Sequence, residues 1–206
     1  MTVRYGLFLA ALLAGASYLP ASWLLPHGAL LAAWKGAGVG LLAVWAVSSA
    51  RTVGGRWIAA ALAFGALGDV LLETSGLTVG AVAFLIGHVI ASALYWSRRR
   101  AGREGTTPAI LLMLGVPLCA YAVSGSPGVL FYSLGLGAMA ATAWISRFPR
   151  GLVGAGAVLF AASDLLIFAR MGPLAGSVVP DLLVWPLYLA GQAMIAFGVV
   201  TTERAR

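Results

Sequence analysis

Eight long apolar segments follow one another along the chain, and no other feature restricts its folding as strongly. The segments cover residues 4–20, 28–49, 56–73, 77–97, 107–123, 128–146, 151–170 and 181–202. A helix that crosses a bilayer needs ~20 mostly apolar residues, so 206 residues have room for eight such helices with short loops. Only 9% of the residues are charged, whereas soluble domains carry roughly 25%. We therefore predict an all-α, multi-pass transmembrane bundle of eight helices that forms a single domain over residues 1–206.

The positive charges are confined to alternate ends of these segments. Eleven of the thirteen Lys and Arg residues lie before the first segment, in the second, fourth and sixth loops, or at the C-terminus: Arg4, Arg51, Arg56, Arg98, Arg99, Arg100, Arg103, Arg147, Arg150, Arg204 and Arg206. Positive loops stay on the cytoplasmic side, so both termini are expected in the cytoplasm and the protein in the cell membrane. The first segment is expected to be retained as a helix. These arginines account for the net charge of +7 as topology signals and lipid contacts, so nucleic acid is not an expected partner.

Two aspartates lie inside apolar segments, where carboxylates are costly and usually functional. Asp69 is thirteen residues after Arg56, and Asp164 is fourteen residues after Arg150. At 1.5 Å per residue these positions lie ~20 Å and ~21 Å along their helices, in the outer half of a hydrocarbon layer ~30 Å thick. Two carboxyls in one dry site take different protonation states. We therefore predict Asp69 and Asp164 as a catalytic acid/base pair.

Other polar side chains are expected at a similar level, and we predict that they bind the substrate: Lys35, His88, Tyr121, Ser163, Tyr188 and Gln192. Lys35 either holds one aspartate ionised or extends to the outer interface, as long basic side chains can. His88, Tyr188 and Gln192 either face the substrate or form hydrogen bonds between helices. Tyr132 is expected at the outer end of its segment, and Glu73 either borders the site or is solvated. With two histidines and no phosphate-binding loop in the sequence, no metal or cofactor is expected.

Small residues form two patterns along the chain. Gly36 with Gly40, and Gly151 with Gly154 and Gly156, have a spacing that is expected to let helices pack closely in lipid. A short internal repeat also relates the third segment to the seventh and the fourth to the eighth. Its matching pairs are Gly68-Asp69 with Ser163-Asp164, and Gly87-His88 with Gly191-Gln192. Because four segments separate the copies, they would run parallel to one another.

Several stretches resemble one known family along the whole chain. They are Trp34-Lys35-Gly36, Phe64 to Leu72 with Gly80, Phe84 and Gly87-His88, Ala120-Tyr121, Leu159 to Asp164, and Pro186 to Gln192. In this order they resemble the YhhN family of integral membrane proteins. The chain departs from the family at Gly36, where a proline is common, and after His88, where a tyrosine often follows.

The resemblance implies hydrolysis of the vinyl ether bond of a lysoplasmalogen, giving a fatty aldehyde and a glycerophospho-base. The expected partners are then a lysophospholipid substrate and membrane lipids. One protonated carboxyl and one carboxylate, the states expected of Asp69 and Asp164, fit this chemistry. Two alternatives use the same aspartates. One is another acid-catalysed lipid reaction, such as epoxide opening or isoprenoid cyclisation, and the other is proton-coupled transport.

Overall fold

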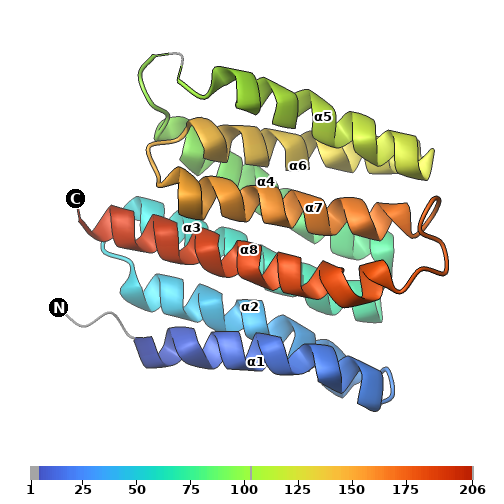
Figure 1. The fold of residues 1–206 in the computed structure, drawn as a ribbon. Coiled ribbons are helices and arrows are strands. Elements are labelled where there is room, and N and C mark those ends of the chain that lie inside the picture. Colours follow the sequence, from blue (N-terminus) through green and yellow to red (C-terminus); the bar gives the residue numbers. More distant parts are fainter. Residues whose placement is uncertain (1–4, 103, 206) are drawn as a thin grey trace. The chain divides into compact units, whose positions relative to one another are not determined.

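A computed structural model describes residues 5–102 and 104–205 of the chain and contains eight long α-helices (Figure 1). They are α1 (Tyr5–Leu24), α2 (Ala29–Ser49), α3 (Val53–Thr74), α4 (Leu77–Ser97), α5 (Thr106–Ser124), α6 (Pro127–Ile145), α7 (Ala155–Ala169) and α8 (Val179–Arg204), and a π-helical turn, η1 (Arg150–Gly154), leads directly into α7. With η1 counted as part of α7, all eight are long and apolar enough to cross a membrane. The predicted all-α fold with eight spans is confirmed, and the largest error in a boundary is at the end of α1, residue 20 against Leu24. Arg4, Arg103 and Arg206, used in the topology argument, lie outside the described residues.

Capping groups in the sequence mark three of the described helix ends. The Thr52 hydroxyl accepts a hydrogen bond from the Gly55 N–H at 3.2 Å, which caps the start of α3. Ser126 caps α6 in the same way. α5 ends at Gly125, whose φ of 62° is left-handed and suits glycine. These local signals place the short loops between the apolar segments.

The helices form two compact units. Unit 1 contains the described residues up to Ala91 and those from Ala196 onward, and unit 2 contains Ser92–Ile195. Each unit therefore includes part of α4 and part of α8. A single domain over the whole chain stays a prediction.

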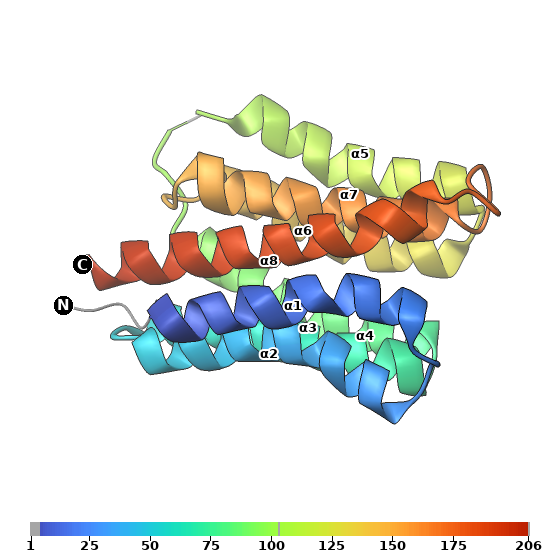
Figure 2. The ribbon, with the colours of Figure 1, turned by 60° about the horizontal axis from the view of Figure 1, so that its bottom comes forward.

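Unit 1 is built on α1, α2 and α3, with α2 in contact with both neighbours (Figures 1 and 2). Gly36 allows a close approach of α2 to α3, because an added Cβ would lie 2.6 Å from the Val70 side chain. The indole ring of Trp45 is fully buried and lies 4.8 Å from the Phe8 ring and 6.3 Å from the Phe197 ring, measured between centroids. This aromatic group ties α1, α2 and the C-terminal part of α8 together.

Unit 2 contains α5, α6 and α7 in mutual contact, with α7 and α8 crossing closely at two glycines. A Cβ added at Gly156 would lie 2.7 Å from the Gly191 carbonyl oxygen, and a Cβ at Gly191 would lie 2.6 Å from the Gly156 oxygen. Close packing is thus confirmed at Gly156 and, in unit 1, at Gly36, while Gly40 would make only an ordinary contact at 3.8 Å. The prediction is wrong at Gly151, which is exposed in the π-helical turn and has nothing within 4 Å of an added Cβ.

The arginine-bearing loops lie side by side within each unit. In unit 2 the Arg147 N–H donates to the Arg98 carbonyl oxygen at 2.7 Å, which joins the α4–α5 loop to the α6–α7 loop. In unit 1 the Arg204 side chain at the end of α8 donates to the Ser49 carbonyl oxygen at 2.6 Å, beside the α2–α3 loop. This grouping agrees with the segregation read from the sequence. Which end faces the cytoplasm stays a prediction.

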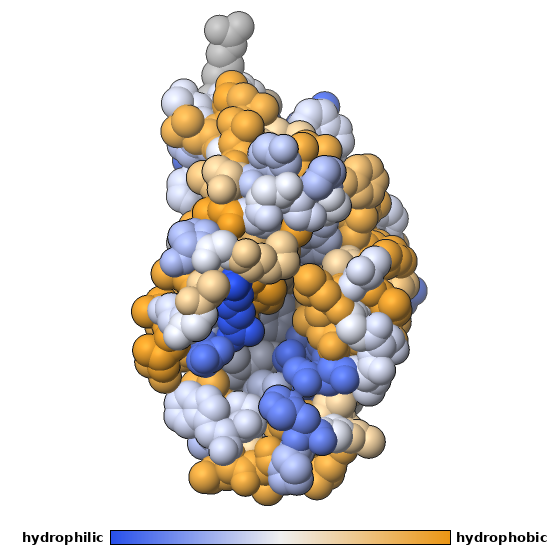
Figure 3. All heavy atoms as spheres, turned by 90° about the vertical axis from the view of Figure 1, so that its right-hand side faces the viewer, coloured by the Kyte–Doolittle hydropathy of each residue, from blue (hydrophilic) through white to orange (hydrophobic). Residues whose placement is uncertain are grey.

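The exterior of the helices is apolar. Leu13, Leu111, Leu118 and Phe131 are 62%, 67%, 65% and 69% exposed. Such helix sides suit contact with lipid tails rather than water, so the chain is a multi-pass membrane protein. Figure 3 looks onto one set of helix ends, where hydrophilic residues gather in a few compact groups among apolar ones.

Candidate active site

Asp69 lies on α3 within unit 1 and is only 2% exposed. The preceding Gly68 lets α4 approach, because an added Cβ would lie 2.7 Å from the Phe84 ring. Glu73, four residues further on, lies on the same face of α3, ~6 Å nearer its C-terminal end. The buried carboxyl therefore lies one helical turn below a polar group at the end of α3.

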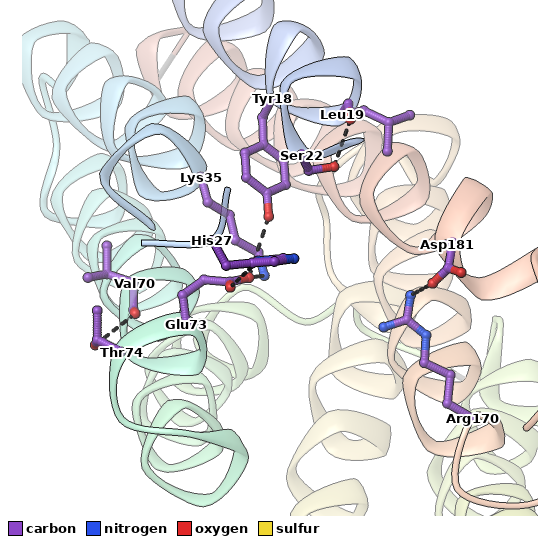
Figure 4. A network of polar contacts seen from close by, with 10 residues as sticks. All are labelled: Tyr18, Leu19, Ser22, His27, Lys35, Val70, Glu73, Thr74, Arg170 and Asp181. Carbon is purple, nitrogen blue, oxygen red and sulfur yellow. Dashed lines mark hydrogen bonds and ion pairs between the residues drawn. The ribbon is translucent and has the colours of Figure 1, made fainter. Parts of the chain in front are cut away.

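That polar group is the Lys35–Glu73 cluster, which consists of Tyr18, His27, Lys35 and Glu73 (Figure 4). The Lys35 ammonium donates to Glu73 Oε1 at 2.7 Å, and the Tyr18 hydroxyl donates to the same oxygen at 3.4 Å. The His27 Nδ1 atom is 3.8 Å from Glu73 Oε2. The Lys35 ammonium is also 5.8 Å from the centre of the Tyr18 ring. Among the described residues Lys35 thus forms its ion pair with Glu73, whereas one of its two predicted roles requires an aspartate.

His88, the other candidate in unit 1, is 2% exposed on α4. The residue before it, Gly87, brings α4 against α3, since an added Cβ would lie 3.1 Å from the Ala61 carbonyl oxygen. The structure therefore places Asp69 and His88 inside unit 1, on two helices that touch.

Asp164 lies on α7 within unit 2 and is 6% exposed. The Tyr132 hydroxyl of α6 donates a hydrogen bond to Asp164 Oδ2 at 2.6 Å, and both groups are buried. The Tyr132 ring packs edge-on against the Phe168 ring, with centroids 5.7 Å apart. The neighbouring Ser163 hydroxyl donates to the Val184 carbonyl oxygen of α8 at 2.9 Å. Ser163 thus joins α7 to α8, and Tyr132 orients the carboxyl.

Two candidates on α8, Tyr188 and Gln192, are also buried in unit 2, at 4% and 5% exposure. The Tyr188 ring lies between aromatic neighbours, 5.1 Å from the Phe160 ring and 5.5 Å from the Trp185 ring, measured between centroids. Unit 2 thus holds Ser163, Asp164, Tyr188 and Gln192 in its buried interior.

Tyr121 is not buried with these residues, because it is 45% exposed on α5. Two tyrosines that bond carboxylates were not among the predicted site residues. Tyr132 could have been found from helix ends, since it is five residues from the start of α6 and Asp164 is five residues from the end of α7. Tyr18 has no such signal, because nothing in the first segment marks one of its faces as inward.

The fold and these buried polar groups define a multi-pass membrane protein that holds carboxyls inside its apolar helices. Comparison with known proteins gives its family. The model of the YhhN family matches residues 30–199, so the chain belongs to the YhhN family. The family prediction is therefore confirmed.

Two relatives have been named for an activity. They are proteins of Mycobacterium bovis and Mycobacterium tuberculosis, both named lysoplasmalogenase, and each is 31% identical to this chain over 194 residues. The alignments cover 87% of this chain and 74% of each relative. No solved structure matches the chain significantly.

Proposed function

We propose that this chain is a membrane hydrolase that cleaves the vinyl ether bond of lysoplasmalogens, releasing a fatty aldehyde and a glycerophospho-base. The observation that carries the proposal is the similarity to proteins named lysoplasmalogenase over 87% of the chain. Two buried carboxyls in apolar helices, Asp69 and Asp164, support it. The substrate is then a lysophospholipid that enters from the surrounding membrane lipids.

The reaction needs one acid and one base. An acid transfers a proton to the vinyl carbon that is not bonded to the ether oxygen. This step leaves an oxocarbenium ion. Water adds to the cationic carbon and gives a proton to the base, and the resulting hemiacetal collapses to the aldehyde and a glycerol hydroxyl. One proton is donated and one is taken up, so the reaction is balanced with water as the only co-reactant.

We assign the proton-donor role to Asp164. Tyr132 bonds its Oδ2 atom at 2.6 Å, which leaves Oδ1 to carry the proton that is transferred. Asp69 is assigned the ionised role, in which it stabilises the oxocarbenium ion and accepts the proton from water. General acid–base groups of this kind contribute typically ~10²–10⁴-fold to a rate.

Turnover by the purified protein tests the proposal. A lysoplasmalogen should release aldehyde, whereas the acyl-ester lysophospholipid with the same headgroup and chain length should not, because it lacks the vinyl ether. Turnover of a lipid epoxide or an isoprenoid without turnover of lysoplasmalogen would indicate the alternative acid-catalysed chemistry. Proton-coupled flux in proteoliposomes without any turnover would indicate a transporter.

The aspartates are tested by Asp69→Asn and Asp164→Asn. Asparagine keeps the shape but cannot carry the proton, and it is cheaper to bury in lipid than a charge, so both variants should fold. Each should lose at least ~100-fold in rate, and the double variant should be little worse than the poorer single one, since the two act together. Asp181→Asn is the matched control, because Asp181 is 59% exposed and pairs with Arg170. Near-parental turnover in either folded single variant contradicts the two-carboxyl mechanism.

A further inference from the structure

The Lys35–Glu73 cluster has no role in the acid/base chemistry, yet it holds opposite charges in a chain that has few. Its members come from α1, the following loop, α2 and α3, and they converge on one carboxylate (Figure 4). The Lys35 and Glu73 side chains are 16% and 24% exposed. The cluster is therefore partly shielded but still open to a ligand.

The two charged groups keep unused bonding capacity. An ammonium has three N–H donors. Within the described part of the chain, Lys35 uses one of them in a hydrogen bond to Glu73 Oε1. The nearest described partner of Glu73 Oε2 is His27 Nδ1 at 3.8 Å, which is beyond hydrogen-bond length. Lys35 can therefore bind a further anion while Glu73 binds a further cation.

The balance of charge selects the class of ligand. An anion placed at Lys35 is repelled by the adjacent Glu73, whereas a zwitterion can satisfy both groups. We infer that the Lys35–Glu73 cluster binds the zwitterionic headgroup of the lysolipid substrate, with its phosphate at Lys35 and its ammonium at Glu73. This inference rests on the proposed function, because it takes a lysolipid as the substrate.

The same groups distinguish between zwitterionic headgroups. A primary ammonium donates N–H bonds to a carboxylate, and charge-assisted bonds of this kind are among the strong ones. The quaternary ammonium of choline has no N–H and is recognised instead by cages of several aromatic rings. The cluster contributes one phenol ring, that of Tyr18, and the imidazole ring of His27, which is fewer rings than such a cage has. Phosphoethanolamine therefore fits it better than phosphocholine.

The distance between the Lys35–Glu73 cluster and Asp69 matches the distance between the phosphate and the vinyl ether of the substrate. Asp69 is four residues before Glu73, which places it ~6 Å deeper along α3 at 1.5 Å per residue. In the lysolipid, four bonds of ~1.5 Å each separate the vinyl ether oxygen from the phosphate ester oxygen, a span of about 5 Å. With its phosphate at Lys35, whose ammonium is 2.7 Å from Glu73 Oε1, the lysolipid therefore has its vinyl ether at the level of Asp69, with the tail continuing into the apolar interior.

Binding of non-cleavable analogues tests the inference separately from catalysis. The probes are saturated 1-alkyl ether lysolipids with phosphoethanolamine, phosphocholine or phosphate alone as headgroup, titrated against the purified full-length protein. The parent should bind the ethanolamine analogue ~10-fold more tightly than the phosphate analogue, in line with one charge-assisted hydrogen bond. Equal binding, or tighter binding of the phosphate analogue, overturns the inference.

Variants show whether the cluster causes this order of binding affinities among the analogues. Glu73→Gln should abolish the preference for ethanolamine over phosphate, and Lys35→Met should weaken binding of all three analogues. Asp181→Asn and Arg170→Met are matched controls, because the Arg170–Asp181 pair also has an N–O distance of 2.7 Å, and they should keep the parental order. If Glu73→Gln keeps that order, the inference fails.

Two further measurements cover the case in which Glu73→Gln binds no analogue and the case in which the cluster binds bulk lipid. If Glu73→Gln binds none of the analogues, Glu73→Asp decides, since a retained carboxylate should retain the ethanolamine preference and its loss contradicts the inference. A two-chain phosphatidylethanolamine should compete weakly, and equal competition would show that the cluster binds bulk lipid and not the substrate. Aldehyde release is not measured in any of these arms, so failure of the proposed function and failure of this inference give different results.

Discussion

At the scale of single residues, the bond between Tyr132 and Asp164 sets the local geometry of the proposed acid. Both groups are buried, and the 2.6 Å bond lies at the short end of the usual range for O–H···O hydrogen bonds. The edge-on contact of the Tyr132 ring with Phe168 fixes the ring and hence the direction of its hydroxyl. The carboxyl is thus held in one orientation by a side chain from a neighbouring helix.

We expect Tyr132→Phe to lower aldehyde release by ~10-fold or more, because loss of the bond leaves a buried carboxyl oxygen unpaired at a cost of ~1–3 kcal/mol. The ring packing is preserved, so the fold should remain. Tyr5→Phe is the control, since Tyr5 is 60% exposed. Steady-state rates of the two variants check this, and equal rates would mean that Tyr132 does not orient Asp164.

At the scale of helices, packing depends on glycines, at which the backbones of two neighbouring helices come close together. In unit 2, Gly156 and Gly191 each face the carbonyl oxygen of the other. Such contacts are typical of helices that associate in lipid. There the hydrophobic effect does not drive helices together, and small residues allow the close van der Waals packing that does. α7 carries Asp164, so this crossing also positions the proposed acid.

Gly156→Val should separate α7 from α8 and destabilise the protein, because overpacking costs typically ~1–3 kcal/mol. Gly115→Val is the matched control, since an added Cβ on α5 meets nothing within 4 Å there. Thermal unfolding of both purified variants in the same detergent measures the difference. Equal midpoints would contradict the importance of this crossing.

At the scale of the whole molecule, the short repeat in the sequence has a counterpart in helix contacts. In unit 1, Gly87 packs against the carbonyl oxygen of Ala61, which is eight residues before Asp69. In unit 2, Gly191 packs against the carbonyl oxygen of Gly156, which is eight residues before Asp164. Equivalent positions thus make equivalent contacts within each unit, which supports two copies of one helix-pair arrangement.

The orientation across the membrane is tested by cysteine labelling. Cys119 is exposed, so the background variant is Cys119→Ala. In that background, Ser126→Cys, between α5 and α6, should react with an impermeant reagent from outside intact cells. Ala101→Cys, exposed between α4 and α5, should react only after permeabilisation. The reverse pattern would invert the predicted topology.

The number of helices, their approximate ends and the segregation of the arginines can be predicted from the amino-acid sequence alone. These features depend on local properties, namely the length of apolar segments and the placement of charge. Such properties govern how each segment inserts and orients in a bilayer. The unusual depth of Asp69 and Asp164 followed from the same reasoning, and both are buried.

Which polar groups contact one another follows from the folded structure and not from the sequence. Lys35 pairs with Glu73, Tyr132 bonds Asp164, and Glu203 near the chain end is 2% exposed and accepts a hydrogen bond from Thr52 at 2.6 Å. In a soluble helix the polar face marks the outside, but a helix in lipid is apolar on all sides, so its sequence does not show which face turns inward. The rotation of each helix is set by contacts such as Gly36 with Val70, between residues far apart in the sequence.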